Sequence, residues 1–305
     1  MRIGLMISMP GDPAGSRELV SRASAAEAAG FASAWLPQVS TVDALTVLAL
    51  AGSSTRTLEL GTAVVPTYPR HPTALAMQAL TVQDATNNRL TLGIGLSHRM
   101  LIEGSLGLDY SRPVPHMREY LTVLNGLLVG ERVQHQGEEY RVTAQVALAG
   151  TKKPPVVVAA LGPDMLRLCG RLADGTVTWM GGIDYLRDVA VPTMSAAAEK
   201  AGKAAPRFVA MVPVLLTSDV SAGNATIDGA FQMYGQIPSY RATLDRGGAK
   251  GPSDVAVVGN AEDIEAGLRA YADVGVTDFV AVIPRQASEA EATTEAVAKL
   301  VGSFA

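Results

Sequence analysis

A serine and a histidine stand side by side after a glycine-containing apolar run in the segment LTLGIGLSH, residues 90–98. Histidine titrates near neutral pH, so His98 is the side chain best suited to move a proton in a catalysed reaction. Gly93 and Gly95 would let neighbouring backbone or a flat ligand lie close to the run. The spacing lacks the complete G-x-G-x-x-G pattern and does not indicate a dinucleotide-binding loop. We interpret the segment as a strand that delivers Ser97 and His98 into a site; the alternative is a tight turn with a surface histidine.

A second candidate for ligand binding is ALGPDML, residues 160–166, in which Gly162 and Pro163 precede a helical pattern. Proline fits the first turn of a helix, and the free N–H groups there attract anions. Ordinary turn chemistry explains the same residues equally well. Arg285, in VIPRQ, could hold an anionic group or pair with a surface carboxylate. His71, in the proline-rich VVPTYPRHP, is expected to cap the following helix.

Several familiar kinds of catalytic site are missing from the sequence. There is no H-E-x-x-H motif and the chain has only four histidines, so we predict no metal site. The G-x-S-x-G pattern of a serine nucleophile is also missing. Cys169 is the only cysteine, which excludes a disulfide within the chain, and it is expected to be a buried residue on a helix.

Strand and helix patterns alternate along the chain, and these elements must position the candidate residues. Eight segments have strand character: RIGLMIS, FASAWLP, LELGTAVV, RLTLGIG, PVVVAA, TVTWM, RFVAMVPVLLTS and TDFVAVIP. The order predicts an α/β protein, a (β/α)8 TIM barrel with insertions after strands 4 and 7. A doubly wound sheet is the rival, but the turn after the first strand, SMPGDPAGS, lacks its glycine fingerprint. We expect one domain over residues 1–305, with insertions at about 96–154 and 218–260. Both insertions would lie at the end of the barrel where active sites form.

The composition narrows the classes of partner. Apolar residues make up 48% of the chain and charged residues 18%, which is typical of a folded globular protein. The net charge is −4 and no basic run occurs, so nucleic acid is a poor candidate. No uninterrupted apolar stretch approaches the roughly 18 residues of a membrane span. The sequence therefore predicts a cytoplasmic protein that acts on a small molecule.

Several long segments together resemble a known family. These are RIGLMI, AAEAAGFASAWLPQ, LELGTAVVPTYPRHPTALAMQALTVQDATNNRLTLGIGLSH, PPVVVAALGPDMLRLCGRLADGTVTWMGG and GVTDFVAVIP. In this order they resemble the luciferase-like monooxygenase superfamily. Within it the chain looks most like the branch of oxidoreductases that use the deazaflavin coenzyme F420, whose members are often described as methylenetetrahydromethanopterin reductase-like. The resemblance covers nearly the whole chain.

The resemblance implies roles for particular residues. It implies a cis peptide bond at Ala63–Val64, in a bulge that supports the cofactor ring. It places the cofactor phosphate on the backbone of residues 161–165. Many relatives carry Asp or His after the second strand, whereas Gln38 stands there in this chain and cannot act as an acid or base. His98 is thus the expected catalytic residue, ahead of a water or a tyrosine from the insertions. The alternative is that His98 only hydrogen-bonds the cofactor. The residues expected to contact the cofactor are Gln38, Ala63, Val64, Ser97, His98, Leu161, Gly162, Pro163, Asp164, Met165, Trp179 and Gly181.

The resemblance also implies an activity. The leading hypothesis is an oxidoreductase that transfers a hydride between F420 and a small organic substrate. An FMN-dependent luciferase-like monooxygenase is the alternative, and a barrel that binds its cofactor without turnover is a third possibility. The resemblance further implies a homodimer.

Overall fold

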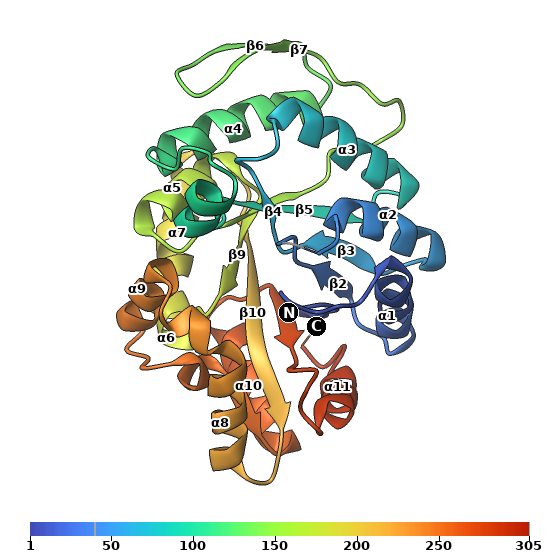
Figure 1. The fold of residues 1–305 in the computed structure, drawn as a ribbon, viewed down its shortest axis with the longest axis vertical. Helices are drawn as coiled ribbons and strands as arrows, with labels where there is room; N and C mark the ends of the chain where they lie inside the picture. Colours follow the sequence, from blue (N-terminus) through green and yellow to red (C-terminus); the bar gives the residue numbers. More distant parts are fainter. Residues whose placement is uncertain (40, 305) are drawn as a thin grey trace.

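The structure is a computed structural model that describes residues 1–39 and 41–304. Within these residues, eight parallel strands form a closed barrel (Figure 1). Each strand pairs with its neighbour, β12 pairs with β1, and β10 pairs with both β9 and β12. The predicted (β/α)8 barrel is therefore confirmed, and an open doubly wound sheet is excluded. The barrel strands are β1 (Arg2–Met6), β2 (Ser33–Leu36), β3 (Glu59–Thr62), β5 (Leu90–Gly95), β8 (Val156–Ala159), β9 (Gly175–Trp179), β10 (Arg207–Leu216) and β12 (Asp278–Val282).

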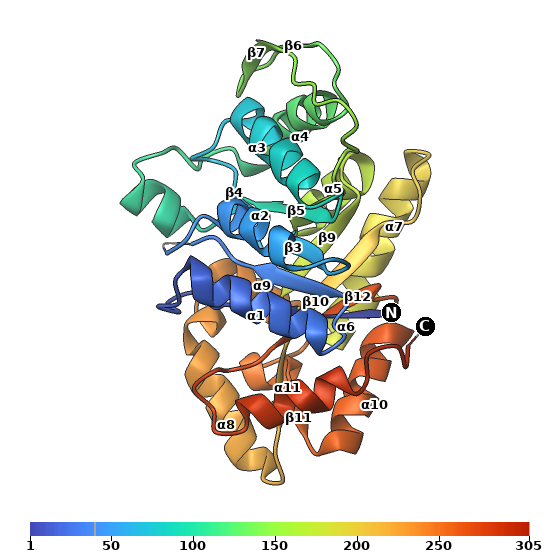
Figure 2. The same cartoon turned by 90° about the vertical axis from the view of Figure 1, so that its right-hand side faces the viewer.

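Helices surround the barrel (Figures 1 and 2). The strands read as nearly continuous apolar runs because parallel strands are covered on both faces. One apolar cluster lies between strands and helices, and a second, which includes Trp35, Val209 and Val280, also draws on the second insertion. The helices after the barrel strands are α1 (Ser16–Ala28), α2 (Ala44–Ser54), α3 (Pro72–Ala85), α4 (Pro113–Leu128), α5 (Pro163–Leu172), α6 (Ile183–Tyr185) continuing through the π-helix η2 (Leu186–Ala190) into α7 (Val191–Lys200), α10 (Ala261–Asp273) and α11 (Ala290–Ala298).

Additional elements follow β3, β5 and β10. The short strand β4 (Val65–Pro66) pairs with β5. After β5 come the π-helix η1 (Met100–Ser105), helix α4 and an antiparallel hairpin of β6 (Val133–Gln136) and β7 (Arg141–Ala144). The segment after β10 reads as polar and glycine-rich, yet it is largely helical. It contains α8 (Val220–Phe231), the 3-10 helix η3 (Gln232–Gly235), α9 (Pro238–Arg246), the 3-10 helix η4 (Pro252–Val255) and the strand β11 (Val257–Gly259).

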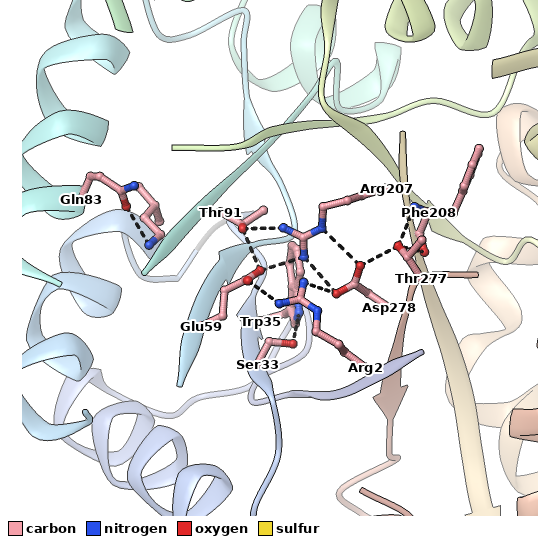
Figure 3. Close-up of polar contacts among 11 residues, drawn as sticks. Arg2, Ser33, Trp35, Glu59, Gln83, Thr91, Arg207, Phe208, Thr277 and Asp278 are labelled. Atoms are coloured by element: carbon pink, nitrogen blue, oxygen red, sulfur yellow. Dashed lines mark hydrogen bonds and ion pairs between the residues drawn. The ribbon is translucent and has the colours of Figure 1, made fainter. Parts of the chain in front are cut away.

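A network of charges closes the N-terminal end of the barrel (Figure 3). Arg207, at the start of β10, donates to Glu59 at 2.8 Å and to Asp278 at 2.9 Å. Arg2 donates to the same two carboxylates. Asp278 is only 2% exposed, and two cations there balance two anions. Because every member begins a strand, the network fixes the end of the barrel opposite the site described next.

Candidate active site at the carboxyl ends of the barrel strands

A cavity of about 350 Å³ opens at the carboxyl ends of the strands. This is the end of a TIM barrel where active sites are built. Residues that follow β1, β2, β3, β5 and β8 line it, together with Trp179 at the end of β9 and a stretch of the second insertion. A volume of this size suits a flat organic ring or a small substrate.

Most of the residues predicted from the sequence meet in this cavity. Those that line it are Gln38, Ala63, Val64, Ser97, His98, Leu161, Gly162, Met165 and Trp179. Pro163, Asp164 and Gly181 are not among the lining residues. The Asp164 side chain is 80% exposed and pairs with Arg167, so only its backbone is available at the start of α5. Gly181 is packed against Tyr185, where a Cβ atom would lie 3.2 Å from the tyrosine ring.

The segment between β3 and β4 forms a bulge that explains the two glycines of LTLGIG. The Ala63–Val64 peptide bond is cis, as the resemblance implies. A Cβ atom on Gly93 would lie 1.9 Å from the carbonyl oxygen of Thr62, and one on Gly95 would lie 2.6 Å from the Val64 side chain. Both glycines are therefore required by the neighbouring chain. Direct approach of a cofactor ring to these glycines stays a prediction.

His98 is the one histidine, among the described residues, that lines the cavity. It is half-buried, and its ring lies edge-on to Tyr240 with centroids 5.4 Å apart. Burial lowers the pKa of His98 below its ordinary value, so the imidazole is mainly neutral at pH 7. The remaining histidines bond elsewhere: His71 Nδ1 accepts from the N–H of Thr73 at the start of α3, His116 bonds Thr67, and His135 pairs with Glu119.

The neighbours of His98 on the rim have defined roles in the backbone. Ser97 has φ +61°, a left-handed conformation that turns the chain out of β5, and its carbonyl oxygen accepts from the Tyr110 hydroxyl at 3.4 Å. The side-chain oxygen of Gln38 accepts from the N–H of Ala44, the first residue of α2. Gln38 therefore anchors a helix start while it lines the cavity.

The start of α5 is open toward the cavity. Gly162 and Met165 line the cavity, and no side chain caps the helix at Gly162. The first N–H groups of a helix have no acceptor within it and carry a partial positive charge. A Cβ atom on Gly162 would meet nothing within 4 Å. Binding of an anionic group at this helix start stays a prediction.

Sequence reasoning named a tyrosine from the insertions as one alternative proton partner but did not identify which tyrosines enter the cavity. Tyr110 comes from the first insertion, and Tyr234 and Tyr240 come from the second. The rings of Trp179 and Tyr234 lie edge-on with centroids 5.4 Å apart, and those of Tyr234 and Tyr240 are 5.3 Å apart. The clue was the stretch FQMYGQIPSY, which is rich in large apolar side chains inside an otherwise polar segment. The stretch lines the cavity only because the second insertion folds back over the barrel.

The cavity wall carries no formal charge. Among the described residues that line it, none is Asp, Glu, Lys or Arg. The described part of the chain also contains no cluster of three or more His, Cys, Asp or Glu residues that could hold a metal ion. Cys169 is buried, as expected. None of the helices described in the structure has the length and apolar character needed to span a membrane.

Comparisons with known proteins agree with this architecture. The family model described as luciferase-like monooxygenase matches residues 1–278. The chain is 30% identical over 190 residues to an F420-dependent glucose-6-phosphate dehydrogenase of Nakamurella multipartita, covering 60% of this chain and 56% of the relative. It is 23% identical over 307 residues to the 5,10-methylenetetrahydromethanopterin reductase of Methanolobus tindarius, covering 90% of this chain and 92% of the relative.

A solved structure confirms the fold over the full length. An F420-dependent secondary alcohol dehydrogenase, in complex with an F420-acetone adduct, superposes with a TM-score of 0.81 at 18% identity, covering 100% of this chain and 99% of that one. The family match extends from the first strand to Asp278, the first residue of β12, and takes in every lining residue of the cavity. The chain belongs to the luciferase-like monooxygenase family.

Proposed function

We propose that the protein is an F420-dependent oxidoreductase that transfers a hydride between F420 and a small organic substrate. The observation that carries the proposal is the cavity at the strand ends, which gathers the bulge at Ala63–Val64, the open start of α5 and His98 around one volume. Relatives named for F420 support the choice of cofactor. F420, when bound, would supply the ring that gives or accepts the hydride.

The residues of the cavity fit such a cofactor. Ala63 and Val64 would support one face of a flat ring, and the apolar side chains around them exclude water. The N–H groups of Asp164 and Met165, at the start of α5, would hold a phosphate group. A cofactor ring changes its charge when it gives or accepts a hydride. A lining without charged side chains favours neither the oxidised nor the reduced ring.

His98 would handle the proton. Oxidation of an alcohol removes a hydride from its carbon and a proton from its oxygen, and the neutral imidazole can accept that proton. In the reverse direction the protonated imidazole would return it to the carbonyl oxygen. The lowered pKa of His98, caused by burial, favours the proton-accepting role at neutral pH.

Gly162→Val should weaken cofactor binding by about tenfold or more, because the new side chain would occupy the place where the phosphate meets the helix start. The protein itself should tolerate the change, since Gly162 has φ −87° and a Cβ atom there contacts nothing. Fluorescence titration of F420 measures the affinity, and thermal unfolding checks the fold. Unchanged affinity would move the anion away from α5, with the exposed Arg285 as the next candidate.

F420 should bind the purified protein more tightly than FMN, in parallel titrations under identical conditions. The second candidate is an FMN-dependent monooxygenase, favoured by the description of the family model. Tighter binding of FMN, with oxygen-dependent turnover, would establish that alternative. Tight F420 binding without conversion of any alcohol or ketone would instead indicate a barrel that binds the cofactor without turnover.

The remaining assignments follow from the family rather than from the cavity. A small-molecule substrate, a homodimer and a cytoplasmic location are proposed on that basis. Nucleic acid is not proposed as a partner, because the chain has a net charge of −4 and no basic run.

A further inference from the structure

One side of the cavity is built by the second insertion. Met233, Tyr234, Ile237 and Tyr240 line the cavity, and we call these four residues the insertion wall. Trp179 meets the wall through its edge-on contact with Tyr234, and His98 meets it through Tyr240. The insertion wall therefore contacts both His98, the expected proton acceptor, and Trp179 at the end of β9. It lies apart in the chain from Ala63, Val64 and the start of α5, where the cofactor is expected.

The wall offers hydrogen bonds but no charge. Within the described residues the hydroxyl groups of Tyr234 and Tyr240 have no hydrogen-bond partner, and both side chains are half-buried. Burial raises the pKa of both tyrosines, to about 12 for Tyr234, so both hydroxyls stay protonated and can donate.

The nearest cations in the sequence are already engaged. Arg99 pairs with Glu103 at 2.6 Å and lies over the Tyr110 ring. Arg241 pairs with Asp245 and donates to two backbone carbonyl groups. Neither arginine lines the cavity. A charged group entering the wall would lose its hydration and gain no partner of opposite charge, which is strongly unfavourable.

We propose that the insertion wall is the substrate subsite and that it takes an uncharged, mostly apolar organic molecule with one oxygen, such as a cyclic ketone or alcohol. The Tyr240 hydroxyl and the His98 imidazole would hydrogen-bond that oxygen, while Met233, Ile237 and Trp179 contact the hydrocarbon. That the bound molecule is a substrate rests on the proposed function. The preference of the insertion wall for uncharged molecules depends only on the residues of the cavity. It distinguishes this chain from the relative named for glucose 6-phosphate, whose substrate carries a phosphate.

Three compounds that share a six-membered carbon ring and differ in the charge of their polar group test the proposal: cyclohexanone, cyclohexanecarboxylate and cyclohexylammonium, with glucose 6-phosphate as a fourth probe. Tryptophan fluorescence reports binding, because the chain has two tryptophans and Trp35 is fully buried and bonded to Ser33. Cyclohexanone should bind at least about tenfold more tightly than each charged probe, a difference of about 1.4 kcal/mol. In Trp179→Phe the fluorescence change should disappear. Equal or tighter binding of either anion, no cyclohexanone binding up to its solubility limit, or a persistent signal in Trp179→Phe overturns the proposal.

A charge placed in the wall locates the subsite. Ile237→Lys should bind cyclohexanecarboxylate about tenfold more tightly than the parent protein and cyclohexanone more weakly. The matched control is Val220→Lys, at an exposed position of α8 that does not line the cavity, and it should leave all four affinities unchanged. If Ile237→Lys behaves like the control, the ring binds elsewhere and the subsite is wrong.

A separate F420 titration keeps this test independent of the proposed function. Saturating cyclohexanone should leave the affinity for F420 unchanged, because the proposal places the two molecules against different lining residues of the cavity. Competition between them would place the ketone in the cofactor position and overturn the subsite. Failure of F420 to bind, with the charge ranking intact, would refute the proposed function and leave the selection by charge standing.

Discussion

Arg207→Leu should lower the free energy of unfolding by about 3 kcal/mol, because it leaves two carboxylates with one remaining cationic partner, Arg2, in a largely buried place. Arg207 bonds Glu59, Asp278 and Thr91 at the base of the barrel, and Asp278 is 2% exposed. Arg2 alone cannot neutralise both acids. Arg207→Lys keeps the charge but loses the planar fork, and about 1 kcal/mol should be lost. Urea denaturation measures both variants.

The control for Arg207 is Arg269→Leu, which removes a surface pair with Glu265 whose side chains are 56% and 47% exposed. This variant should change the free energy of unfolding by no more than about 0.5 kcal/mol. A loss as large as that of Arg207→Leu would mean that any arginine matters equally and that burial of the network does not.

The pH dependence of the Arg207 variant has a definite sign. Burial alone would raise the pKa of Glu59 and of Asp278, but the two arginines hold both pKa values below the ordinary range. Their stabilising contribution is present above the unfolded-state carboxyl pKa of about 4 and is lost as the pH falls through the lower folded-state values. The difference in stability between the parent and Arg207→Leu should therefore narrow below about pH 4. A difference that widens in acid would contradict this account of the network.

The barrel could be predicted from the sequence because each strand is a short apolar run followed by a helical pattern. The helices of the second insertion could not be predicted this way. Helix α8, VSAGNATIDGAF, is rich in residues with low helix propensity, and its few apolar side chains pack through Ile227 and Phe231. Helix starts were also ambiguous. Thr41 and Asp43 both precede α2 and are both residue types that cap helices. The structure uses Asp43, which accepts from the N–H of Thr46 and also pairs with Arg70.

Some residues of the candidate site could be predicted from the sequence and others could not. Ser97, His98 and Gly162 stand directly after strands, so finding the strands placed them on the rim. The insertion wall depends on how a long segment folds back over the barrel, and no local pattern determines that path. The charge network at the N-terminal end of the barrel could not be predicted from the sequence. Arg207 and Glu59 are 148 residues apart in the chain, and they meet only because both begin strands of one closed barrel.

His98→Ala should reduce turnover by about 10²-fold or more, while the affinity for F420 stays within about twofold of the parent value. Removing the imidazole takes away the one histidine that lines the cavity in the described structure, but none of the expected phosphate contacts. The assay follows F420 reduction with cyclohexanol. In the parent protein, oxidation should persist to a pH below the ordinary histidine value of about 6.5 and then fall as His98 becomes protonated, because burial lowers its pKa.

His98→Gln separates proton transfer from hydrogen bonding at this position. Glutamine can donate and accept a hydrogen bond but cannot take up a proton near neutral pH, so turnover in His98→Gln should stay as low as in His98→Ala. The matched control is His71→Ala, which removes an exposed histidine at the start of α3 that does not line the cavity, and turnover should be unchanged. Recovery of activity with glutamine would show that His98 only binds the substrate or the cofactor. In the reverse reaction, reduction of cyclohexanone, the proton would then come from another group, and the hydroxyl of Tyr240, whose ring contacts His98, is the nearest candidate in the insertion wall. Tyr240→Phe in the His98→Gln background would abolish the recovered reduction of cyclohexanone if that hydroxyl is the source.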